Sequence, residues 1–209
     1  LTADLKAVAR VGSGAISQIL DVWWAPTHLA FATEHVNGPT LAELVAEARE
    51  AGKTLPLPLA LSVVLEAARA LSVAHSPFSS GGAVIHGDLR PELVLVDPEG
   101  AVKLTGFGFS RFLPAVSPDG AWARTEDRAY QSTERVLDGS LEPAADVFAL
   151  GAMLLEAITG QPPFGDRRGA SLAEAVSKGA LDLPPLDEDL ARVIRCACAL
   201  DPAQRYPGV

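Results

Sequence analysis

The sequence predicts an α+β fold that is mainly helical. Apolar residues recur at three- and four-residue spacing in several segments, which is the pattern of helices that bury one face. Two short apolar runs near the middle of the chain flank a turn, which is the pattern of a β-hairpin. With 209 residues, 48% of them apolar, the chain is long enough for one hydrophobic core and short for two. We therefore expect one globular unit.

The hairpin is predicted over residues 93–104. Its two arms, residues 93–96 and 102–104, flank the turn Asp97-Pro-Glu-Gly100, which has Pro at its second and Gly at its fourth position. Residues 107–134 are rich in Ser, Pro, Asp and Arg and show no clear periodicity. We expect this second segment to form a long loop.

Two segments have the Ser/Thr-x-x-Glu form, in which both side chains satisfy free amides at the start of a helix. They are Thr40-Leu-Ala-Glu43 and Ser171-Leu-Ala-Glu174. The first predicts a helix over residues 41–51, and the second predicts another short helix. A further helix is expected to open at Pro56 and Pro58, because proline is tolerated in the first helical turn.

Three helices are predicted from their apolar patterns. The helix that follows Pro58 is expected to end at His75, which we assign a packing or capping role, and to bury a face made of Leu61, Val64, Leu65, Ala68 and Leu71. Residues 146–160 are apolar nearly all round, as in a helix that is buried on every side. The last amphipathic helix carries Leu190, Val193, Ile194, Ala197 and Leu200.

Composition excludes several classes of function. A net charge of −9 argues against a surface for nucleic acid or anionic membrane, where Lys and Arg must neutralise phosphates. No uninterrupted apolar stretch approaches the roughly 20 residues of a membrane helix. Two cysteines, Cys196 and Cys198, are too few and too close for a disulfide framework. We expect no membrane span, a cytoplasmic location, and a protein or small-molecule partner. Trp23, Trp24 and Trp122 are candidate anchors for a protein partner, but Trp23 and Trp24 are expected to divide between core and surface at the end of a strand.

The segment around the hairpin carries two recognisable motifs. Residues 86–93 are His-Gly-Asp-Leu-Arg-Pro-Glu-Leu, and residues 106–108 are Gly-Phe-Gly. They resemble two motifs of the bacterial-type (Hanks-type) Ser/Thr protein kinases, His-Arg-Asp-Leu-Lys-Pro-Glu-Asn and Asp-Phe-Gly. In that family the first Asp faces the substrate hydroxyl, and the Asn and the second Asp hold magnesium. Asp88 matches the first Asp, but Leu93 and Gly106 stand at the two metal-ligand positions.

Later landmarks occur in the order that the same family shows. Residues 130–134, Tyr-Gln-Ser-Thr-Glu, resemble the end of the activation segment, and residues 146–160 resemble the central helix of the kinase C-lobe. The resemblance implies that Glu134 pairs with Arg205, and that His86 and Asp146 belong to the scaffold. It predicts a protein kinase-like fold with a mainly helical C-lobe.

The resemblance also predicts the domain organisation. Residues 1–38 would be a truncated N-lobe with its hinge, and residues 39–209 the C-lobe, with 106–134 as the activation segment. The N-lobe remnant would comprise the tail of the helix usually called αC, with Asp4 near its ion-pairing position, and two or three strands, one of them over 16–22 after a turn at Gly12-Ser-Gly14. When residues 1–38 are aligned with the family's N-lobe in this way, the sequence contains neither the glycine loop nor the ATP-binding Lys.

The chemistry of the site has competing interpretations. Asp88 is either a catalytic base or an anchor for its own loop. Glu92 and Asp97 are candidate replacement metal ligands, but both are expected to brace the loop or face solvent. Arg90 replaces a Lys that contacts phosphate in the family, so it is a candidate phosphate contact. Gly87 replaces an Arg that receives a phosphorylated activation segment in regulated kinases.

From the two lost ligands we predict a pseudokinase that is not an enzyme and binds no metal or cofactor. It would act as a protein-binding scaffold or allosteric regulator in signalling, with an active kinase or another domain of the same protein as partner. The alternative is an active Ser/Thr kinase, or another nucleotidyl-transfer enzyme, that uses Asp88 with non-standard metal ligands. A third hypothesis is a receptor for acidic or phosphorylated peptides through Arg124, Arg128 and Arg135.

Overall fold

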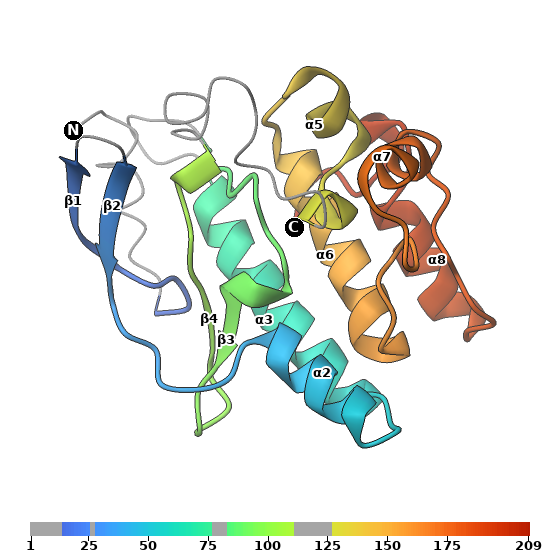
Figure 1. Ribbon diagram of the computed structural model, residues 1–209, viewed down its shortest axis with the longest axis horizontal. Helices are drawn as coiled ribbons and strands as arrows, with labels where there is room; N and C mark the ends of the chain where they lie inside the picture. The colour runs from blue at the N-terminus through green and yellow to red at the C-terminus, as the bar shows by residue number, and fades with distance from the viewer. Residues whose placement is uncertain (1–13, 26–27, 77–82, 111–126) are drawn as a thin grey trace.

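The computed structural model describes residues 14–25, 28–76, 83–110 and 127–209 (Figure 1). Within them, six α-helices and two small antiparallel sheets confirm the predicted α+β class with a mainly helical lobe. The strands are β1 (Ile19–Ala25), β2 (His28–Thr33), β3 (Val94–Val96) and β4 (Val102–Leu104). The helices are α2 (Leu41–Glu50), α3 (Leu57–His75), α5 (Thr133–Asp138), α6 (Pro143–Thr159), α7 (Gly169–Ser177) and α8 (Glu188–Ala197). Three short 3₁₀ turns are η1 (Pro91–Leu93), η2 (Asp127–Tyr130) and η3 (Pro202–Gln204).

Strands β1 and β2 form a hairpin at the edge of the molecule, away from α7 and α8 (Figure 1). The strand predicted over 16–22 begins later, at Ile19, because the residues before it pair elsewhere. Ser17 N–H donates to Leu104 O at 2.8 Å, and Leu104 N–H donates to Ala15 O at 2.9 Å. These bonds occupy the free edge of β4, and they place Ile16 in the core with 5% of its surface exposed.

The two predicted capping boxes have different outcomes. At α2, Thr40 Oγ1 accepts from Glu43 N–H at 3.1 Å, and a Glu43 carboxylate oxygen accepts from Thr40 N–H at 2.7 Å, as predicted. The box at Ser171 is wrong, because α7 begins at Gly169 and contains Ser171. The Ser171 hydroxyl instead donates to Arg168 O at 2.8 Å, so it satisfies a carbonyl and caps no amide.

Helix α3 buries a face that shares only Val64 and Leu71 with the predicted one. Leu61 is 41% and Leu65 51% exposed, whereas the buried face consists mainly of alanine and valine. Its members are Ala60, Val63, Val64, Ala67, Ala70, Leu71 and Ala74. Small side chains let α3 approach α6 closely, so they outweigh the larger leucines in deciding which face packs. By length and composition α3 could cross a membrane, a property that core helices of soluble proteins share.

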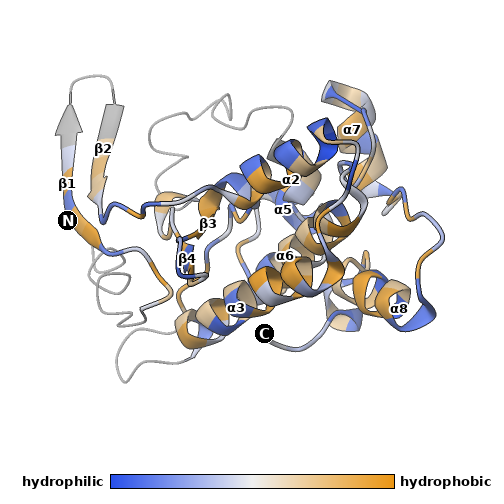
Figure 2. Cartoon of the chain, turned by 90° about the horizontal axis from the view of Figure 1, so that it is seen from below, coloured by the Kyte–Doolittle hydropathy of each residue, from blue (hydrophilic) through white to orange (hydrophobic). Residues whose placement is uncertain are grey.

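Helix α6 is the centre of the lobe. Twelve of its residues are buried, and α2, α3 and α8 all contact it. Figure 2 shows hydrophobic residues along both α6 and its neighbour α3. At Gly151 an added Cβ would lie 2.7 Å from Ala197 Cβ and 2.7 Å from Cys198 Sγ, so only glycine permits this approach of α8. The predicted helix that is buried on every side is present.

Candidate functional site

The loop that carries Asp88 is held by one buried carboxylate of α6. Asp146, which is 1% exposed, accepts from His86 N–H at 2.8 Å and from Gly87 N–H at 2.8 Å. Its Oδ2 also lies 2.8 Å from His75 Nε2 at the end of α3. Three donors therefore converge on Asp146, and the loop position just before Asp88 is fixed to the two central helices. The packing role expected for His75 is a specific contact to Asp146.

The imidazole of His86 joins the same loop to the segment that follows β4. His86 Nε2 lies 2.8 Å from Thr105 O, so Nε2 carries the proton and Nδ1 is free to accept from Asp88 N–H at 3.4 Å. The ring packs against Phe107 in a tilted arrangement, with 4.6 Å between ring centroids and 58° between ring planes. Ser110 Oγ donates to His86 O at 2.6 Å. His86 is therefore a structural residue of the site.

Asp88 lies among guanidinium groups. Its side chain is 13% exposed, and its Oδ2 lies 3.5 Å from Arg90 Nη1. Arg135 of α5 lines the same small cavity of about 10 Å³, with Gln131 and Asp146. Burial lowers the pKa of Arg135, while the charges of Asp88 and Asp146 raise it. Arg135 was predicted to belong to a surface for peptides. Its position beside Asp88 could not be predicted, because no local motif links the two residues.

The two metal-ligand positions of the resemblance contact each other. A Cβ added at Gly106, whose φ is +83°, would lie 3.1 Å from Leu93 Cδ1 and 3.4 Å from Leu93 Cδ2. Leucine therefore covers the position where an Asp would extend. Magnesium prefers about six oxygen ligands, and neither residue supplies a side-chain oxygen. The residues at these positions do not fit the ion.

The two candidate replacement ligands are engaged elsewhere. Asp97 Oδ1 accepts from Glu99 N–H at 3.0 Å and from Ala101 N–H at 2.7 Å, so it stabilises the hairpin turn. The Glu92 side chain is 55% exposed, with an oxygen 3.7 Å from Arg90 Nε. Among the described residues no group of three or more His, Cys, Asp and Glu side chains could hold a metal ion.

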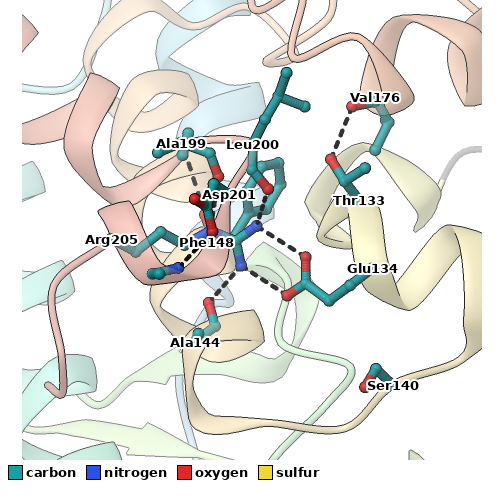
Figure 3. A network of polar contacts seen from close by, with 12 residues as sticks. Thr133, Glu134, Ser140, Ala144, Phe148, Val176, Ala199, Leu200, Asp201 and Arg205 are labelled. Carbon is teal, nitrogen blue, oxygen red and sulfur yellow. Dashed lines mark hydrogen bonds and ion pairs between the residues drawn. The ribbon is translucent and has the colours of Figure 1, made fainter.

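A buried ion pair ties the start of α5 to the end of the chain (Figure 3). Arg205, whose side chain is fully buried, donates to both carboxylate oxygens of Glu134 at 2.7 and 2.8 Å, and to Ala144 O at 2.9 Å. Burial alone would raise the pKa of Glu134, but the bonds from Arg205 and the backbone, with the Arg205 charge, lower it below its ordinary value. This is the pairing that the resemblance implied.

The segment before α5 is anchored to α6 and α7. The Tyr130 hydroxyl donates to the Glu156 carboxylate of α6. Burial raises the pKa of Glu156, and this bond lowers it in part. Thr133 Oγ1 donates to Val176 O at the end of α7 at 3.1 Å. The segment that contributes Tyr130, Gln131 and Ser132 to the cavity beside Asp88 is therefore attached to both helices.

Gly87 has no room for the arginine found there in regulated kinases. Its φ is +72°, and an added Cβ would lie 2.3 Å from Leu141 Cδ2 and 2.9 Å from Ser110 Oγ. The place where that arginine would receive a phosphate is therefore occupied by the side chains of Leu141 and Ser110. Three other predicted residues lie outside the described residues: Asp4 within residues 1–13, and Trp122 and Arg124 within residues 111–126.

Comparison with known proteins decides the family. The family model described as "Protein kinase domain" matches residues 1–207. The chain belongs to the protein kinase family. Among curated relatives, the serine/threonine-protein kinase PknL of Mycobacterium tuberculosis is 28% identical over 208 residues, which cover 97% of this chain and 50% of PknL. The tyrosine-protein kinase MasK of Myxococcus xanthus is 26% identical over 212 residues, which cover 98% of this chain and 33% of MasK.

A third relative, the serine/threonine-protein kinase PknA of Mycobacterium tuberculosis, is 30% identical over 175 residues, which cover 83% of this kinase-family chain and 38% of PknA. The chain thus spans about half the length of PknL and less of the other two. These comparisons contradict the prediction that the chain is not an enzyme, because its relatives are named as kinases. That prediction equated the loss of two metal ligands with the loss of activity, and the family points to an enzyme.

Proposed function

We propose that this chain is the C-lobe part of a protein kinase that transfers a phosphoryl group to a protein hydroxyl, with Asp88 as the proton acceptor. The supporting observation is the position of Asp88. Its loop is fixed by the hydrogen bonds to Asp146, its carboxylate is largely shielded from water, and the Arg90 guanidinium lies 3.5 Å away. A positioned carboxylate of this kind is suited to general base catalysis.

In the proposed step the acceptor hydroxyl oxygen forms a bond to phosphorus and loses its proton to Asp88. The bond from phosphorus to the leaving oxygen of the triphosphate breaks, and that oxygen keeps the electron pair. Arg90 offers a planar set of N–H donors that can hold phosphate oxygens beside Asp88. No step is assigned to magnesium, because Leu93 and Gly106 do not fit it.

The test is Asp88→Asn in the longest natural form of the protein, with transfer of labelled phosphate from ATP to a generic protein substrate as the measurement. We expect a rate loss of about 10²- to 10⁴-fold, which is the usual contribution of a general base. Glu99→Gln removes an exposed carboxylate in the same hairpin and is the matched control. Equal rates for the Asp88→Asn variant and the unmodified protein would overturn the proposal.

A second candidate role is protein binding in signalling, as a scaffold or as an allosteric regulator of another kinase or domain. The contact between Leu93 and Gly106 favours it, because a lobe that packs its metal-ligand positions can serve as a rigid binding surface. The measurement is the rate of a partner kinase with and without the Asp88→Asn protein. A changed rate supports this role, and an unchanged rate at saturating protein contradicts it.

A further inference from the structure

We propose that Leu93 and Gly106 form an apolar closure that prevents divalent cations from binding where η1 meets the end of β4. The inference concerns binding and not turnover, so it is independent of the proposed function. It goes beyond the loss of two ligands, since it assigns the exclusion to one contact, the 3.1 Å approach of Leu93 Cδ1 to the Cβ position of Gly106.

The backbone oxygens around this contact are already used. Leu93 O accepts from Thr105 N–H at 3.0 Å, and Thr105 O accepts from His86 Nε2 at 2.8 Å. One lone pair of each carbonyl is therefore used in a hydrogen bond that holds the site together, which leaves a cation at most the second lone pair of each oxygen.

Neighbouring carboxylates do not compensate. Asp97 bonds the amides of its own turn, and Glu92 is exposed beside Arg90. Asp88 has the Arg90 guanidinium 3.5 Å from its Oδ2, and that positive charge repels a cation. Each carboxylate nearest in sequence to the contact thus has a competing amide or guanidinium beside it, whereas the ion needs about six oxygens.

The contact also opposes the return of an Asp at position 106 alone. An Asp at Gly106 would meet Leu93 at 3.1 Å and would adopt a positive φ, although Asp tolerates this region better than most residues. An Asn at position 93 alone would face a glycine and offer one oxygen. The double substitution Leu93→Asn with Gly106→Asp keeps the branched shape of residue 93 and places two oxygen-bearing side chains at the contact, so it is the matched variant for a test.

The experiment uses Mn²⁺ alone, which broadens NMR signals of nearby methyl groups, on the full chain with ¹³C-labelled leucine methyls. The reporter is Leu104, which is fully buried two residues before Gly106. The reference is Leu172 on α7, which lies on the other side of the molecule (Figure 1). In the unmodified protein we expect equal broadening of both signals up to about 1 mM Mn²⁺, a concentration at which weak protein sites fill.

In the double variant we expect Leu104 to broaden at least tenfold more than Leu172, with reversal by excess Mg²⁺. Selective, Mg²⁺-reversible broadening of Leu104 in the unmodified protein would overturn the inference, whatever the variant does. A folded double variant that shows no selective broadening would also overturn it, because the contact would then not be the cause. Failure of the phosphate-transfer assay leaves this measurement unaffected, so the two proposals fail separately.

Discussion

At the scale of single residues, the site depends on Asp146 more than on any group that could take part in chemistry. Its two oxygens bond two successive amides of the loop and face His75 from α3. One carboxylate thereby links three parts of the chain that lie far apart in sequence. The position of Asp88 is a consequence of this arrangement, since Asp88 directly follows the two anchored amides.

Asp146→Asn is the first prediction. The amide would keep one acceptor oxygen but present an N–H₂ group to donors, so at least one buried N–H would lose its partner. We expect a loss of about 2–4 kcal/mol in the free energy of unfolding, measured by urea denaturation. Asp166→Asn changes an exposed carboxylate and is the control. A loss no larger than that of the control would contradict the anchoring role of Asp146.

Glu134 gives a prediction of pH dependence. Its pKa is lowered in the folded protein, so the native state binds fewer protons than the unfolded state as the pH falls. The stabilisation by Glu134 is fully present above its ordinary pKa of 4.5 and is lost as pH falls through the lowered folded value. Glu134→Gln should cost about 3 kcal/mol at pH 7, because it leaves the buried Arg205 without its partner charge.

The measurement for Glu134 is urea unfolding of both proteins from pH 7 to pH 3. The difference in unfolding free energy between the unmodified protein and Glu134→Gln should shrink below the ordinary pKa of 4.5. A difference that stays constant over this range would show that the ionisation of Glu134 does not contribute to stability.

At the scale of secondary structure elements, contacts between neighbouring residues predict where helices and turns begin, but they do not predict which face of a helix is buried. The start of α2 and the β3–β4 turn follow from side chains that bond neighbouring amides, so their sequences predict them. The buried face of α3 does not follow from hydrophobicity, since Leu65 is exposed and Ala67 is buried. Which face packs depends on how closely α6 approaches, and no local pattern contains that information.

The candidate site shows the same division. Asp88, Leu93 and Gly106 could be assigned one by one from motifs. The predicted β3–β4 hairpin also brings Leu93 and Gly106 together, because they lie at its two outer ends. The position of Arg135 beside Asp88 could not be predicted, because it depends on where α5 packs and joins residues far apart in sequence.

Gly151 provides a prediction at this scale, because the contact of α6 with α8 depends on its missing side chain. Gly151→Ala should destabilise the protein by about 1–3 kcal/mol, since its Cβ would meet Ala197 and Cys198 at 2.7 Å. Urea denaturation is the measurement. Gly208→Ala adds a methyl group in open space and is the control. Equal stability of the two variants would mean that α8 can move aside without cost.

At the scale of the whole molecule, one continuous cluster of buried residues runs from Ile16 before β1 to Ile194 and Cys198 at α8. The loop that carries Asp88 and the Glu134–Arg205 pair are both attached to this cluster through α6. We therefore expect the described lobe to unfold cooperatively, with no part of the site lost before the rest.

Cys198 reports on that cooperativity. Burial raises the pKa of the Cys198 thiol to about 12, and its Sγ lies 3.6 Å from Phe148 O in the core. At pH 8 only about one thiol in 10⁴ would be ionised, so a thiol reagent should label Cys198 only after global unfolding.

In the Cys196→Ser variant, the labelling rate measured by mass spectrometry should rise with urea in parallel with the unfolded fraction. Cys198→Ser, which leaves the partly exposed Cys196, should instead be labelled at a rate that depends little on urea. Urea-independent labelling of Cys198 under native conditions would show that α8 separates from α6 while the rest of the lobe stays folded.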